Sequence, residues 1–130
     1  MQELTIYDRT FFGENVGEVQ ITISGEITTV REIITARVEA EVSSYNRQQV
    51  QYFRGLVQPS EGEQTQNGFR LKTRQKIDPE QHTYLALDCF LKNQYFILID
   101  DVQAESLDQE VTLRPKTEIS FLKLTPLVGG

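Results

Sequence analysis

Hydrophobic and polar residues alternate near the N-terminus, which is the pattern of half-buried β-strands. Residues 4–7 alternate in this way, and residues 19–23 repeat the alternation after a loop that is bracketed by Gly13 and Gly17. Two such segments joined by a glycine-containing loop predict an antiparallel hairpin. Gly25 is expected to end the second strand.

The period then changes from two residues to that of an amphipathic helix, over about Thr29 to Tyr45. Thr29 followed by Glu32 fits a capping box, in which the two side chains satisfy free backbone N–H groups of the first turn, and Thr28 is an alternative cap. We expect the charged residues of this helix, Arg37 and Glu41 among them, to lie on its other faces. Its apolar stripe comprises Val30, Ile33, Ile34, Val38, Val42 and Tyr45.

A second helix is predicted from about residue 79 to residue 92. Asp78 is a favourable N-cap and Pro79 fits the first helical position. Asn93 can adopt the left-handed conformation that often follows the last turn of a helix. The expected apolar face comprises Tyr84, Leu87 and Leu91, widened by Leu85 and Phe90.

The C-terminal third returns to strand-like patterns. Residues 95–99 form a continuous apolar run, typical of a central strand that is covered on both faces. Residues 118–124 predict a final strand that leads into the tail. Because alternate residues of a strand face opposite ways, Phe121 and Leu124 cannot both point inward. We favour Ile119 and Phe121 as the inward pair.

This order of elements predicts one α+β domain over residues 1–130. A first and a last strand can lie side by side and parallel when a helix crosses over between them. The result is a mixed sheet packed on the first helix, which is the β-grasp (ubiquitin-like) arrangement. An inserted segment at about residues 46–93 contains the second helix, and a flexible tail covers about residues 125–130.

Four basic residues alternate with other residues shortly before the second helix, so a strand would place all four on one face. One interpretation is a docking stripe for an acidic partner. The other is a solvated edge strand, because charged residues on sheet edges discourage aggregation, and we favour this one. The four residues are Arg70, Lys72, Arg74 and Lys76.

Composition argues against several classes of function. The net charge of -6 disfavours binding to a nucleic-acid backbone. No apolar stretch approaches the roughly 18 residues of a membrane span, and the first residues do not resemble a signal peptide. The single cysteine excludes an internal disulfide framework. We therefore expect a cytoplasmic protein with neither nucleic-acid nor membrane partners.

The chain also offers little for catalysis. His82 is its one histidine and Cys89 its one cysteine, about two helical turns apart in the predicted second helix. A zinc site would need clustered ligands, and phosphate-binding glycine loops are absent from the sequence. We therefore expect a protein that is not an enzyme and that binds neither a metal nor a cofactor, with Cys89 in the core.

The chemistry that remains is at the C-terminal tail. Gly129 and Gly130 lack β-carbons, so this extended end can enter a narrow slot. A free carboxylate does not acylate other molecules in water at useful rates, so this end could react only after a partner enzyme adenylates it with ATP. The alternative is a frayed end without a function. Pro126 stiffens the base of the tail, and Leu127 and Val128 can anchor it in an apolar channel.

The last 36 residues (130 − 95 + 1) resemble the C-terminal part of β-grasp carriers. The turn at residues 100–101, the strand at residues 118–124 and the proline before Gly129 and Gly130 are similar to those of the sulfur carriers of molybdopterin and thiamine synthesis. The chain also resembles bacterial ubiquitin-like modifiers that are encoded beside their own activating and conjugating enzymes. The hairpin and first helix match weakly, and residues 46–93 have no counterpart in the smaller carriers.

The resemblance implies that Gly130 is adenylated and transferred, and that Gly129 is the small residue before it. It also implies a partner-binding tail of Leu124, Pro126, Leu127 and Val128. By the same resemblance Phe121 would face the activating enzyme, although Phe121 and Leu124 could equally be core residues of the last strand. The expected function is that of a protein modifier whose partners are an activating enzyme that consumes ATP, a conjugating enzyme, a deconjugating protease and target proteins. One alternative is a sulfur carrier with a thiocarboxylate at its end. A second is a β-grasp interaction module that is not conjugated.

Overall fold

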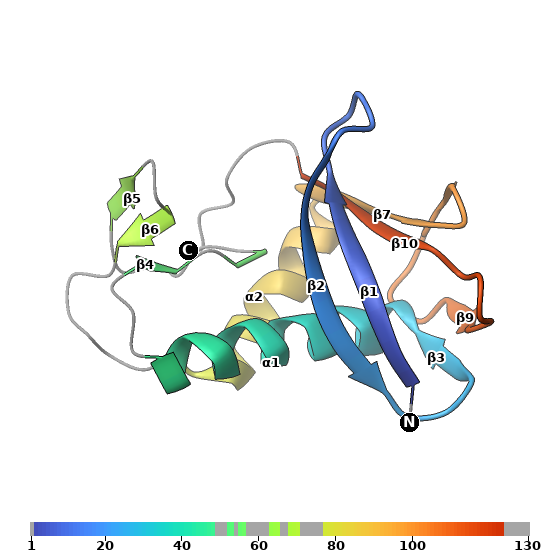
Figure 1. The fold of residues 1–130 in the computed structure, drawn as a ribbon, viewed down its shortest axis with the longest axis horizontal. Coiled ribbons are helices and arrows are strands. Elements are labelled where there is room, and N and C mark those ends of the chain that lie inside the picture. Colours follow the sequence, from blue (N-terminus) through green and yellow to red (C-terminus); the bar gives the residue numbers. More distant parts are fainter. Residues whose placement is uncertain are drawn as a thin grey trace.

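The structure is a computed structural model in which the described residues are 2–48, 52–53, 55–56, 63–65, 68–70 and 77–123. These residues form two helices and three β-sheets (Figure 1). The helices are α1 (Val30–Gln48) and α2 (Pro79–Leu91). The strands are β1 (Gln2–Arg9), β2 (Asn15–Ile23), β3 (Ile27–Thr29), β4 (Tyr52–Phe53), β5 (Glu63–Thr65), β6 (Gly68–Arg70), β7 (Tyr95–Ile99), β8 (Val102–Gln103), β9 (Glu110–Thr112) and β10 (Ile119–Lys123).

The largest sheet has five strands in the order β2-β1-β10-β7-β8. β1 pairs antiparallel with β2, and parallel with β10 so that Ile6 lies opposite Ile119. β10 also pairs antiparallel with β7, which places the last strand at the centre of the sheet. The predicted hairpin and the predicted parallel pairing of first and last strands are both confirmed. The fold is therefore mixed α+β.

α1 crosses one face of this sheet, and α2 lies beside α1 (Figure 1). The core between helices and sheet includes Ile6, Ile33, Ile97 and Phe121, all fully buried. Ile119 and Phe121 point inward, as predicted. The small β4-β6-β5 sheet lies beyond the C-terminal end of α1, apart from the five-stranded sheet (Figure 1).

Both threonines that the sequence offered as caps make hydrogen bonds at the N-terminus of α1, but only Thr29 caps a backbone N–H. The Glu32 backbone N–H donates to the Thr29 hydroxyl at 3.2 Å, which is one half of the predicted capping box. The Glu32 carboxylate does not complete the box, because it accepts a 2.6 Å hydrogen bond from the Thr28 hydroxyl. The N–H groups of Val30 and Arg31 donate instead to carbonyl groups of the loop at residues 107–109. That loop therefore fixes the position of the helix start.

α2 has the predicted ends and part of the predicted face, because Leu87 and Phe90 are buried. The Asp78 side chain accepts from the Glu80 N–H at 3.0 Å, and Asn93 has the left-handed φ of 58°. Tyr84 and Leu91, however, are each 63% exposed. The sequence contains two overlapping apolar stripes, and the stripe that includes a histidine is the one that packs against α1 and β7. The buried residues are His82, Ala86, Leu87, Cys89 and Phe90, so the prediction for Cys89 is confirmed.

β7 also differs from its prediction, because only one of its faces is buried in the core. Tyr95 and Ile97 point inward and are fully buried, whereas Phe96 and Leu98 on the opposite face are half-buried. Phe96 makes an edge contact with Phe11 of the hairpin loop, at 6.1 Å between ring centroids. The continuous apolar run therefore does not mark a strand that is covered on both faces. Its outward-facing Phe96 instead packs against Phe11.

Tyr95 generates a prediction about alkaline pH. Its ring stacks on Phe121, its hydroxyl donates to the Ala86 carbonyl at 2.8 Å, and burial raises its pKa above the ordinary value of 10.0. The folded protein therefore keeps a proton that the unfolded chain releases, so this stabilisation is complete below pH 10 and is lost as the pH rises further. Between pH 9 and pH 11, wild type should lose about 1.4 kcal/mol more unfolding free energy than Tyr95→Phe. Urea denaturation at both pH values measures this difference, and equal losses would contradict the assignment.

Candidate functional site

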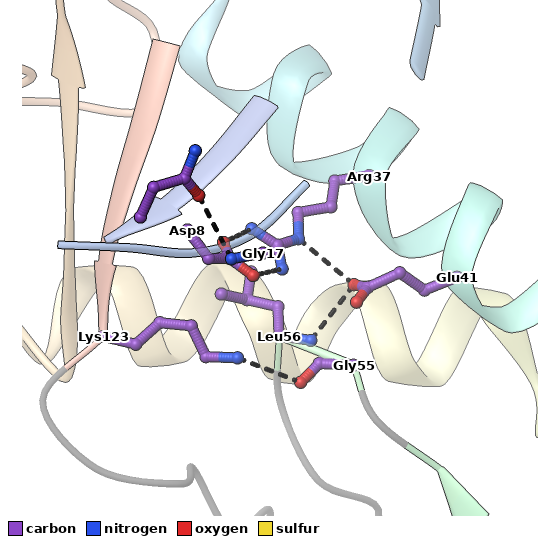
Figure 2. Close-up of polar contacts among 8 residues, drawn as sticks. Asp8, Gly17, Arg37, Glu41, Gly55, Leu56 and Lys123 are labelled. Atoms are coloured by element: carbon purple, nitrogen blue, oxygen red, sulfur yellow. Dashed lines mark hydrogen bonds and ion pairs between the residues drawn. The ribbon is translucent and has the colours of Figure 1, made fainter. Parts of the chain in front are cut away.

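The predicted conjugation terminus and partner-binding tail lie outside the described residues. These residues are Gly129, Gly130, Leu124, Pro126, Leu127 and Val128. The described structure ends at Lys123, the last residue of β10. The geometry of the candidate site is therefore that of the tail root, by which we mean Asp8, Arg37, Glu41, Gly55, Leu56 and Lys123 (Figure 2).

Of the four basic residues of the possible docking stripe, the structure describes only Arg70. Arg70 ends β6, while Lys72, Arg74 and Lys76 lie outside the described residues. β6 is the middle strand of its sheet, where Arg70 is opposite Tyr52 on one side and Glu63 on the other. The edge-strand interpretation is therefore wrong at Arg70, because that residue is paired on both sides. The docking stripe stays a prediction.

A buried arginine organises the tail root. Arg37 on α1 is 1% exposed and reaches across to β1, where its two terminal nitrogens donate to the two carboxylate oxygens of Asp8 at 2.5 and 2.8 Å (Figure 2). This two-point geometry is the strongest form of a charged hydrogen bond. The guanidinium carbon also lies 4.7 Å from the centre of the Phe121 ring on β10, in a cation–π contact. Arg37 thus connects α1 to both strands at the centre of the sheet.

Glu41 extends the network by one helical turn. Its Oε1 atom accepts from Arg37 Nε at 3.3 Å and from the Leu56 backbone N–H at 3.1 Å (Figure 2). The Leu56 side chain belongs to the hydrophobic core. Glu41 therefore connects Leu56, which follows α1 in the chain, to Arg37.

Lys123 is the second cation of the tail root. Its Nζ donates to the Gly55 carbonyl at 3.5 Å, and the residue is half-buried (Figure 2). Burial lowers the pKa of Lys123 below its ordinary value, and the positive charge of Arg37 lowers it further, while Asp8 and Glu41 oppose the shift. The two cations and two carboxylates balance in formal charge. The tail root therefore holds its charges fixed and close to neutral overall.

Sequence reasoning missed this network because it placed Arg37 and Glu41 on polar faces of the helix. The signal that could have found it is periodicity. Asp8 continues the inward alternation of Ile6 on β1, and Arg37 follows Ile33 and Ile34 at helical spacing. A charged residue at an inward position needs a partner of opposite charge, since burying it without one is costly.

The described residues contain no group of three or more His, Cys, Asp or Glu side chains that could hold a metal ion. Neither of the two described helices is long and apolar enough to cross a membrane. His82 and Cys89 both lie in the buried face of α2. No family model, curated protein or solved structure matches this chain.

Arg37 provides a direct test of the network. Arg37→Met leaves the Asp8 carboxylate buried without its partner and should cost about 3–5 kcal/mol of unfolding free energy. Arg31→Met is the matched control on the same helix, because Arg31 is 48% exposed and pairs with the exposed Asp108. That substitution should cost less than about 1 kcal/mol. Chemical denaturation measures both values, and similar costs for the two variants would show that Arg37 is not the organising charge.

Proposed function

We propose that this chain is a ubiquitin-like protein modifier with a β-grasp fold, which is activated at Gly130 and attached through Gly130 to target proteins. The observation that carries the proposal is the parallel pairing of β1 with β10, in a sheet that α1 crosses on one face (Figure 1). It places the last strand of the chain at the centre of the sheet. The strand order and the position of α1 are those expected of a β-grasp domain.

The composition of the segment at residues 124–130 supports the same function. Its apolar residues and its two terminal glycines suit a narrow channel.

The proposed chemistry uses the chain as the acyl donor. The Gly130 carboxylate attacks the α-phosphate of ATP in an activating enzyme, forming an acyl adenylate and releasing pyrophosphate. A cysteine thiolate of an activating or conjugating enzyme then attacks the acyl carbon, which forms a thioester and releases AMP. Finally, a target amine displaces the thiolate to form an amide. A deconjugating protease would hydrolyse that amide.

In this scheme the chain contributes shape and reach, and the partner enzymes contribute the catalytic groups. The chain itself binds no cofactor, and ATP is consumed by the activating enzyme. Because the reaction requires ATP, we place it in the cytoplasm. Residues 46–93 add surface that the smaller carriers lack, and a modifier can use such surface to bind effectors.

The proposal is tested by expressing the chain together with its neighbouring genes. Wild type should give a ladder of heavier species on a denaturing gel, and deletion of Gly130 should abolish the ladder. The reason is that the deletion removes the acyl group that the enzymes recognise. Lys116→Arg, on an exposed turn, is the control and should keep the ladder.

Two outcomes would contradict the proposal. A ladder of equal intensity after deletion of Gly130 would exclude attachment through that residue. Absence of a ladder, with an intact-mass increase that matches one oxygen replaced by sulfur, would identify a sulfur carrier instead.

A further inference from the structure

Two side chains of the tail root contact opposite ends of the peptide group between Gly55 and Leu56. The carbonyl of Gly55 accepts from Lys123 Nζ, and the N–H of Leu56, which belongs to the same peptide group, donates to Glu41 (Figure 2). A cation thus faces the negative end of the peptide dipole, and a carboxylate faces its positive end. Both Gly55 and Leu56 are buried. We name this arrangement of Glu41, Gly55, Leu56 and Lys123 the peptide clasp.

The components of the clasp come from distant parts of the chain. Glu41 lies on α1, Gly55 and Leu56 lie in the segment that follows it, and Lys123 ends β10. Charged groups are an expensive means of joining such elements, because apolar packing of similar volume is often as stable or more stable. What a charged network adds is a defined geometry. In this protein the network defines the geometry around Lys123, the residue that precedes residues 124–130.

We infer that Lys123 is a positioning residue, whose hold on the Gly55 carbonyl fixes the backbone at the base of the tail and thereby prepares Gly130 for entry into the adenylating enzyme. The inference rests on the proposed function and extends it. A base that is already ordered spares the enzyme the entropic cost of fixing it on binding. The effect should therefore appear in the KM for this chain and not in kcat.

The charged groups that act on Lys123 lie on β1 and α1, while β7 places Tyr95 opposite it and residues 55–56 carry no charged side chain. Asp8 on β1 and Glu41 on α1 favour its positive charge, and Arg37 on α1 disfavours it. Lys123→Met keeps the apolar part of the side chain while it removes the donor and the charge. Because burial already opposes that charge, the substitution should change Tm by less than about 5 °C. The folded protein can therefore be assayed directly.

The experiment compares wild type with Lys123→Met, Lys123→Arg and Lys116→Met. Lys123→Arg retains a cationic donor, and Lys116→Met is the matched control at an exposed lysine. The first measurement is hydrogen exchange at the Leu56 amide by NMR. Lys123→Met should accelerate this exchange by about fivefold or more, because the clasp has lost one side. Lys123→Arg and Lys116→Met should stay near wild type.

The second measurement is ATP–pyrophosphate exchange by the adenylating enzyme that produces the wild-type ladder. Lys123→Met should raise the KM for the chain roughly tenfold, with kcat within about twofold of wild type. Lys123→Arg should recover most of the change. A role in folding stability would accelerate amide exchange without altering KM, so the two measurements separate positioning from stability.

Three results would overturn the inference. If wild type is adenylated and Lys123→Met has the same KM, Lys123 does not position the tail, and the proposed function stands. If the Leu56 amide exchanges at the wild-type rate in Lys123→Met, Lys123 does not hold this peptide group in solution. If wild type itself is not adenylated, the proposed function fails and the inference fails with it.

Discussion

The buried guanidinium of Arg37 is the constraint on which the rest of the structure depends. It sits between helix and sheet, donates two hydrogen bonds to Asp8 on β1 and lies over the ring of Phe121 on β10. A buried positive charge cannot be left without partners, so α1 must cross the sheet where both strands can meet it. The parallel pairing of the first and last strands and the position of the crossing helix are therefore linked to one side chain.

The same network connects the folded domain to its proposed working end. Through Glu41 it reaches Leu56, and Lys123 contacts the adjoining carbonyl, so the start of the tail belongs to an ordered and nearly neutral group of charges. These charges hold the backbone in place and take no part in the proposed reaction. That role suits a protein whose reactive group, the Gly130 carboxylate, is activated by a partner enzyme. In the proposed function, the interactions that stabilise the domain also position the start of the tail.

Local signals predicted much of the fold, and non-local interactions account for what was missed. Alternation and helical spacing, with the caps at Thr29 and Asp78, identified the hairpin, both helices and the parallel pairing of β1 and β10. The Arg37–Asp8 pair was missed because its members are 29 residues apart (37 − 8) and periodicity treats charge as a mark of the surface. The buried face of α2 was predicted only in part: Leu87 and Phe90 are buried, but Tyr84 and Leu91 are exposed, because the contacts of α2 with α1 and β7 bury a stripe that includes His82. Of the predicted site, Gly129 and Gly130 lie outside the described residues.

The central claim is that the acyl group of Gly130 is what becomes attached to other proteins. Trypsin cleaves after Lys123, so each conjugated target should retain residues 124–130 on the modified amine. Mass spectrometry of tryptic digests of the conjugates measures this remnant directly. The account predicts target lysines that carry the seven-residue remnant (130 − 123) joined through Gly130. Heavier species that lack the remnant, or that are linked through any other residue of this chain, would contradict it.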